Sequence, residues 1–185
     1  DYWVADAMDL TGVSIVMVEY NAVFGADRAV TVPRNDAFVA SQAHYSGVYF
    51  GASLAAFLDL MEAKGMAFVG TNRACCNAFF IRQDQVAELP LDPPDHSELA
   101  RYTDYHYRSA RDERGSLLGS TPTQTRALLG SLPLVDVRSG ATIDVADLGT
   151  PSGNGLMDLW AEFRILDMGI RLGRFITRFR TTHFT

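Results

Sequence analysis

Apolar residues along this chain fall into short continuous runs and into runs with helical spacing. Residues 13–18 form a continuous, mostly β-branched run, which is the pattern of a strand buried on both faces of a parallel sheet. The apolar runs 66–70 and 77–82 predict two further strands. A polar turn around 71–73 separates these two runs, so they are expected to pair antiparallel.

Helical spacing accompanies these strands. Between residues 53 and 64 the apolar positions recur every three or four residues, which predicts a helix that ends at Gly65. The short aromatic segment 1–8 is predicted as a further helix. The segment 22–47 has no clear period and predicts a long loop, and a loop of that length in a compact domain is usually functional or a lid.

The second part of the chain has weaker patterns. Prolines at 90–94 indicate a linker, and helices are predicted over 97–114 and 121–132. A weak hairpin signal covers 134–145. The tail 149–185 has apolar residues at three- and four-residue spacing and predicts an amphipathic helix.

These elements predict an α/β fold. The order strand, loop, helix, strand, turn, strand is typical of half of a doubly wound sheet that ends in an antiparallel pair. We therefore expect an incomplete doubly wound, Rossmann-like sheet with a helical C-terminal extension. The expected division is an α/β part over 1–90, an extension with helices and the weak hairpin over 91–148, and a helical tail over 149–185.

Composition and charge narrow the class of protein. The chain has 185 residues, of which 48% are hydrophobic, so it can bury a real core. Its net charge is −6, but the tail is basic and the rest is acidic. An acidic body offers no general footprint for nucleic acid. The arginines of the tail either contact phosphate or form an ordinary solvated helix face.

Targeting and metal signals are weak. The sequence opens without a basic and apolar leader, and no run approaches the ~18 apolar residues of a membrane span. We therefore expect a cytoplasmic protein that has no membrane partner. Cys75 and Cys76 are adjacent, so a disulfide between them would be strained, and two cysteines alone cannot close a zinc site. Reduced, buried thiols and no metal site are expected.

Polar residues follow the first predicted strand. Glu19, Tyr20 and Asn21 come directly after the apolar run. Ligands of open α/β sheets bind beyond the carboxyl ends of the strands. A carboxylate there accepts hydrogen bonds from a substrate or acts as a base. The alternative is that Glu19 caps a loop or pairs with Arg28.

Several segments occur together in an order that resembles one protein family. They are Asp1–Val4, Val18–Asn21, Tyr49–Leu54 and Asn77–Phe80. They resemble a group of bacterial proteins related to FkbM-type methyltransferases, whose members show Asp-Gly-Asn-Asp-Tyr-Trp-Val at the end of the fourth strand. The segments 109–115 and 132–137 are similar to the C-terminal extension of that group. The resemblance covers about residues 1–148 and only the C-terminal half of such a domain.

The resemblance implies a class I methyltransferase fold, with S-adenosylmethionine as the ancestral cofactor and a small molecule or glycan as acceptor. The family's glycine-rich first βα turn and its ribose-binding acidic residue belong to the N-terminal half, which this sequence does not contain. Those groups supply most of the recognition in such sites. We therefore expect that this chain alone neither binds S-adenosylmethionine nor catalyses methyl transfer.

The tail resembles a second, unrelated family. Gly149–Pro151, Asn154 and Leu156–Trp160 match the Gly-Thr-Pro-x-x-Asn-x-Leu-x-Asp-Leu-Trp segment of Swi/Snf-type helicase-like ATPases. The stretches 166–169 and 171–174 are similar to its continuation. The alternative is an ordinary helix with a Gly/Pro-rich first turn. The sequence has no phosphate-binding Gly-x-x-x-x-Gly-Lys, so we expect no ATPase activity.

Three functional hypotheses remain open from the sequence. The first is a partial methyltransferase-like domain that acts with a partner supplying the missing half. Its candidate catalytic residues are Asp1, Glu19 and Asn21. The second is a fragment that contacts nucleic acid, for which the candidates are Arg171, Arg174 and Arg178. The third is a chimeric chain without a function of its own, which self-associates through an exposed sheet edge.

Overall fold

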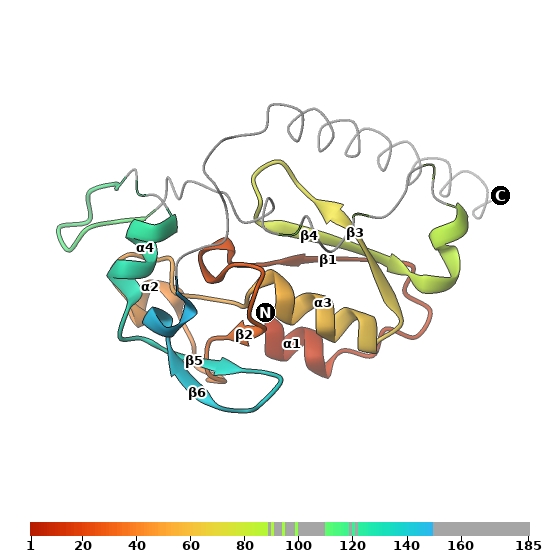
Figure 1. Cartoon of the computed structure of the whole chain (residues 1–185), viewed down its shortest axis with the longest axis horizontal. Helices are drawn as coiled ribbons and strands as arrows, with labels where there is room; N and C mark the ends of the chain where they lie inside the picture. The colour runs from red at the N-terminus through yellow and green to blue at the C-terminus, as the bar shows by residue number, and fades with distance from the viewer. Residues whose placement is uncertain are drawn as a thin grey trace.

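A computed structural model gives the structure of the chain. It describes residues 1–88, 90, 94, 99, 110–118, 120 and 122–149. The described residues combine helices with two three-stranded antiparallel sheets (Figure 1). The predictions for the tail beyond Gly149, and for the 97–114 helix up to residue 109 apart from Leu99, lie outside the described residues. The end of that helix prediction was wrong, because residues 110–114 form a turn and a bridge.

The element bounds are as follows. The α-helices are α1 (Tyr2–Ala7), α2 (Ala40–Ala43), α3 (Leu54–Ala63) and α4 (Pro122–Leu129). The strands are β1 (Ile15–Glu19), β2 (Val30–Thr31), β3 (Met66–Thr71), β4 (Asn77–Arg82), β5 (Pro133–Asp136) and β6 (Thr142–Asp144). The 3-10 helices are η1 (Ala22–Phe24), η2 (Gln83–Glu88) and η4 (Val145–Leu148). The helices predicted over 1–8, 53–64 and 121–132 are confirmed as α1, α3 and α4.

The first sheet has the strand order β1-β4-β3. β4 pairs antiparallel with both neighbours, so β1 and β3 run in the same direction on either side of it. The predicted antiparallel pair of 66–70 and 77–82 is confirmed. Every pairing between described strands is antiparallel, so a doubly wound parallel sheet is not seen among them.

The prediction that 13–18 is a parallel strand buried on both faces was wrong. β1 lies at the edge of the described sheet, pairs antiparallel with β4, and leaves the side chain of Met17 59% exposed. A continuous apolar run shows that a strand is apolar on both sides. It does not show which neighbours the strand has or in which direction they run.

Two helices cover the same face of the first sheet. α3 packs on β3, and α1 packs on α3. The rings of Tyr2 and Phe57 meet there with their centroids 5.9 Å apart. Figure 1 shows α1 and α3 together on one side of β1, β3 and β4.

The second sheet has the order β2-β5-β6. The predicted hairpin over 134–145 is confirmed as β5 and β6. β5 also pairs with β2, which belongs to the segment 22–47 that the sequence predicts as a loop. That segment contains η1, β2 and α2 and is therefore more structured than predicted. The extension packs on the first part of the chain, and Leu129 and Leu134 lie in the same core as the residues of α3.

A buried arginine joins α4 to η1. Arg126 donates from Nε to the carbonyl of Val23 at 2.5 Å and from Nη1 to the carbonyl of Gly149 at 2.8 Å. Burial lowers the pKa of this guanidinium, and the charge of Asp27 opposes that shift. A Cβ at Gly25 would lie 2.6 Å from Nη2, and Gly25 has φ of +80°, so this approach needs glycine.

The segment 48–53 connects the two sheets. It bonds to β2 through Ser53 N–H to Val30 O at 2.8 Å, and to the residues that follow β1 through Asn21 N–H to Ala52 O at 2.7 Å. Ser53 ends the segment and caps α3. Its hydroxyl accepts from the N–H groups of Val30 and Ala56 and donates to the carbonyl of Arg28 at 2.7 Å.

Ser53→Ala is expected to lower the free energy of unfolding by about 2–4 kcal/mol, because it leaves two N–H groups and one carbonyl without their buried partner. Urea denaturation monitored by circular dichroism measures the change. Ser41→Ala, at an exposed position of α2, is the matched control and should stay within about 0.5 kcal/mol of the parent. Equal effects of the two substitutions would contradict the role given to Ser53.

Candidate functional site

The best-placed group of polar residues lies where β1 and β3 end. Because these two strands run in the same direction, their carboxyl ends meet at one end of the first sheet, where β4 begins. We call this end the carboxyl edge. It carries Glu19 from β1, Thr71 from β3, Asn77 from β4 and the turn 72–76. Ligands of α/β sheets bind at such edges.

Glu19 is the last residue of β1 and is exposed. Its Cα partner across the ladder is Asn77. Arg28, the alternative partner considered from the sequence, pairs instead with Asp136 at 3.1 Å. The carboxylate of Glu19 is thus open to solvent at the carboxyl edge, where it can accept a hydrogen bond from an approaching ligand.

Asn21 is fully buried and committed to the fold. Its Nδ2 donates to the carbonyls of Val48 and Phe50, both at 2.9 Å. Its Oδ1 accepts from the N–H of Val23 at 3.1 Å and so caps η1. Both amide protons are used, and the side chain has no access to solvent. The catalytic role predicted for Asn21 stays a prediction, and the geometry gives this side chain a structural task.

Asp1 lies against the same segment as Asn21. Its Oδ2 is 3.5 Å from the place that a Cβ on Gly51 would take, and Gly51 has φ of +65°. Asn21 bonds to the residues on both sides of Gly51. The structure therefore brings Asp1 and Asn21 to one segment and leaves Glu19 at the end of β1. Asp1 is exposed, as a ligand-binding carboxylate needs to be.

The turn 72–76 was missed as a site feature by the sequence reasoning. The Oδ1 of Asn72 accepts from the N–H groups of Cys76 and Asn77, both at 3.1 Å, and its Nδ2 donates to the sulfur of Cys76 at 3.3 Å. Cys75 has φ of +50°, which is uncommon for a residue other than glycine. Cys75 is buried and Cys76 half-buried, and they form no disulfide with each other.

Thr71 adds an unusual group at the carboxyl edge. The residue is only 3% exposed, and its Oγ1 has no hydrogen-bond partner among the described residues. An unbonded buried hydroxyl costs roughly 1–3 kcal/mol. Its Cα partner on β4 is Ala78, and Val18 of β1 pairs with that same Ala78. The hydroxyl is therefore a hydrogen-bond donor at the carboxyl edge that no described residue accepts from.

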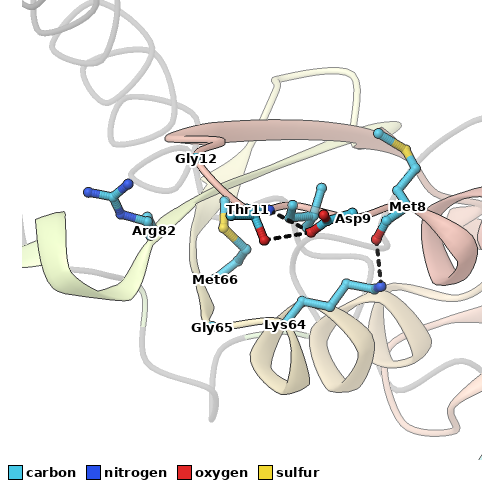
Figure 2. A pocket seen from close by; sticks show the side chains of 9 residues that line it. Met8, Asp9, Thr11, Gly12, Lys64, Gly65, Met66 and Arg82 are labelled. Atoms are coloured by element: carbon cyan, nitrogen blue, oxygen red, sulfur yellow. Dashed lines mark hydrogen bonds between the residues drawn. The ribbon is translucent and has the colours of Figure 1, made fainter.

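A shallow groove of about 420 Å³ lies at the opposite end of the first sheet (Figure 2). Lys64 donates there to the carbonyls of Asp6 and Met8, at 2.7 and 2.9 Å. Asp9 accepts from the N–H and hydroxyl of Thr11, and these bonds lower the pKa of its carboxyl. Figure 2 shows Arg82 pointing away from this group. Lys64, Asp9 and Arg82 all have hydrogen-bond partners within the protein, Arg82 with Asp84 at 2.6 Å, so the groove offers fewer polar groups to a ligand than the carboxyl edge.

A serine and a histidine meet in the loop between α2 and α3. The Nδ1 of His44 lies 2.7 Å from the Oγ of Ser46 and also accepts from the Ser46 N–H at 3.3 Å. Ser46 is fully buried, so its hydroxyl is no accessible nucleophile. Burial lowers the pKa of His44. The pair closes a local turn in which the neutral imidazole is the acceptor.

Other site predictions receive no structural test or only a limited one. Arg171, Arg174 and Arg178 lie outside the described residues. In the described part of the chain, no group of three or more His, Cys, Asp or Glu is placed to hold a metal ion. None of the helices described there is long and apolar enough to cross a membrane.

Comparisons with protein-family models, with curated proteins and with solved structures found no match to this chain.

Two substitutions separate the structural asparagine from the exposed glutamate. Asn21→Asp places a carboxylate oxygen 2.9 Å from two carbonyl oxygens, and is expected to cost roughly 3–5 kcal/mol of unfolding free energy. Glu19→Gln changes an exposed side chain and should stay within about 0.5 kcal/mol. Chemical denaturation measures both. A stable Asn21→Asp protein would show that the carboxamide is not the anchor described here.

His44 predicts a pH dependence of stability. Its pKa is lowered in the folded state from the ordinary value of 6.5, so the unfolded chain binds more protons just below pH 6.5. The stabilisation from the neutral imidazole is complete above pH 6.5 and is lost as the pH falls toward the folded pKa. His44→Asn keeps an acceptor for Ser46 but does not titrate. The difference in unfolding free energy between parent and variant should shift in favour of the variant between about pH 7 and pH 5. A constant difference would disprove the assignment.

Proposed function

We propose that this chain forms the acceptor-side part of a methyltransferase-like, incomplete doubly wound sheet. In this proposal it acts together with a cofactor-binding half that supplies S-adenosylmethionine, and its carboxyl edge positions a small-molecule or glycan acceptor. The observation that carries the proposal is the arrangement of β1, α3, β4 and β3.

The connection from β1 to β3 supports this assignment. The two strands run in the same direction and are joined through α3, which is the βαβ connection of doubly wound sheets. β4 is inserted between them and runs antiparallel, as expected for a sheet that ends in an antiparallel pair. α1 lies on the same face as α3, as consecutive crossovers of one hand require when their strands step across a sheet in one direction.

The described residues do not fit the cofactor itself. The crossover helix α3 follows β1, and its first residues, Leu54 to Ala56, are fully or almost fully buried. The N–H of Leu54 donates to Gly25 O, and that of Ala56 to the Ser53 hydroxyl. These amides are therefore occupied by the protein. Binding of S-adenosylmethionine belongs, in this proposal, to the partner half.

The contribution of this chain is to position the acceptor. Methyl transfer needs the acceptor atom aligned with the methyl group, and it needs a base only where the acceptor must lose a proton. Glu19 is open to solvent at the carboxyl edge and can hold an acceptor hydroxyl by accepting its hydrogen bond. Asp1 offers a second carboxylate beside Gly51. No observation on the described residues favours the nucleic-acid alternative.

Calorimetric titration tests whether binding of S-adenosylmethionine requires the cofactor-binding half. This chain alone is expected to show no binding of S-adenosylmethionine at concentrations up to roughly 1 mM. The coding sequence upstream of the Asp1 codon is expected to encode a strand, a glycine-rich turn and a helix, and the polypeptide that includes them should bind the cofactor. Micromolar binding by the chain alone, or an upstream sequence without such a unit, would contradict the proposal.

In the cofactor-binding polypeptide, Glu19→Gln is expected to lower the rate of methyl transfer by roughly 100-fold, because the carboxylate that orients the acceptor is lost. Binding of S-adenosylmethionine should not change. Glu62→Gln, at an exposed position near the end of α3, is the control with the same chemical change. Full activity of the Glu19 variant would remove this residue from the site.

A further inference from the structure

The outer edge of β1 carries backbone groups that no described strand pairs. Arg82 N–H donates to Ser14 O at 2.9 Å, and Tyr20 N–H donates to Cys76 O at 2.8 Å. Between these two bonds, every second residue of an antiparallel strand turns its backbone N–H and C=O toward its partner. In β1 the residues that turn toward β4 are Val16 and Val18. The backbone groups of Ile15, Met17 and Glu19 therefore point away from β4, and no described strand pairs with them.

Exposed apolar side chains lie on the elements around this edge. Val4 of α1 is 65% exposed, Met8 directly after α1 is 48% exposed, and Met17 of β1 is 59% exposed. Met8 follows the last turn of α1, bonds through its N–H to the carbonyl of Val4 at 3.1 Å, and lies four residues after Val4, so the two residues are on the same side of the helix end. The opposite side of α1 is buried through Tyr2 and Ala5. α1 thus has one side in the core and one apolar side that the described residues leave open.

The direction of α1 defines what fits this edge. α1 begins at Asp1, which lies by Gly51 near the carboxyl edge. It ends near Lys64, at the opposite end of the sheet. α1 therefore runs antiparallel to β1, like the helix of a strand-helix-strand crossover that finishes in β1.

Handedness then fixes the position of the strand that would precede such a helix. Nearly all crossovers between parallel strands have the same hand. Two crossovers whose helices lie on the same face must therefore step across the sheet in the same direction. The crossover through α3 steps from β1 toward β3, so a crossover through α1 steps toward β1 from the other side. That side is the open edge.

We propose that the β1 edge and the apolar side of α1 form one docking surface for a parallel β-strand of the cofactor-binding half. The partner strand bonds to the backbone of Ile15, Met17 and Glu19 and has apolar side chains on both faces. Those side chains, with the elements that follow, cover Met17 on one face and Val4 and Met8 on the other. This inference rests on the proposed function, since it names the partner's contact surface.

Amide hydrogen exchange tests the docking without any assay of methyl transfer. In the chain alone, the amides of Ile15, Met17 and Glu19 should exchange fast, and those of Val16 and Val18 should be protected. The probe is the full chain extended before Asp1 by a strand of about six Val, Ile and Thr residues and a turn of roughly three Gly and Asn residues. The extension should slow exchange of the three outward amides by about 100-fold or more.

Two controls separate docking from general stabilisation. In the extended chain, Met17→Pro removes an outward N–H and leaves the bonds to β4 intact, and it should abolish the protection of Ile15 and Glu19. The same extension with two prolines in its strand is the second control and leaves β1 unchanged. It should also give no protection.

Unchanged exchange in the extended chain, or equal protection with the proline-bearing extension, would overturn the proposal. Protection of the same amides that rises with concentration in the unextended chain would assign the edge to a second copy instead, and would also overturn it. A failed docking result leaves the calorimetric test of the proposed function unaffected. If the strand docks but the longer polypeptide does not bind S-adenosylmethionine, the proposed function is contradicted and the docking surface is still supported.

Discussion

The buried carboxamide of Asn21 is the interaction on which the arrangement of the two sheets depends. It joins the end of β1 to the carbonyls of Val48 and Phe50, and its backbone N–H adds a bond to Ala52. The same segment, 48–53, bonds on its other side to β2 and so to the second sheet. A group that satisfies two carbonyls at once in the core stabilises one geometry and penalises alternatives, because each lost bond leaves a buried carbonyl unsatisfied.

The position of the carboxyl edge follows from this anchoring. β1 ends at Glu19, and the chain must then turn inward so that Tyr20 and Asn21 are buried. Glu19 therefore remains as the exposed end of β1, while the two residues after it are part of the core. The carboxylate of Asp1 lies beside the segment that Asn21 holds. One structural residue thus sets the location of the two carboxylates that the candidate site uses.

The local elements could be predicted from the sequence, and the relations between distant segments could not. α3 was predictable because Ser53 caps its start and Gly65 follows its end. The hairpin of β3 and β4 was predictable because two apolar runs flank a polar turn. The pairing of Val30 with Asp136 joins segments far apart in sequence, and the residue pattern of neither strand indicates which strand it pairs with.

The candidate site shows the same limit. A polar residue after an apolar strand predicts a ligand-binding group, and on that pattern Glu19 and Asn21 were equal candidates. The structure separates them because only Asn21 meets backbone carbonyls, and those belong to a segment that the sequence cannot place. The Thr71 hydroxyl, which has no hydrogen-bond partner in the described part of the chain, has no signal in the sequence, since threonine is a common residue inside strands.

The two outer strands of the first sheet differ in a way that bears on its completeness. Natural sheets protect their edges with bulges, prolines, charges or short strands. β3 has such a feature, because its register with β4 shifts between Phe68 and Gly70. β1 pairs with β4 in continuous register, and its outward positions are Ile15, Met17 and, at the end, Glu19. A regular edge with one terminal charge is suited to receive another strand, whereas the bulged edge of β3 is suited to end a sheet. This asymmetry agrees with the side of β1 that crossover handedness assigns to a preceding strand, and the two arguments use different observations.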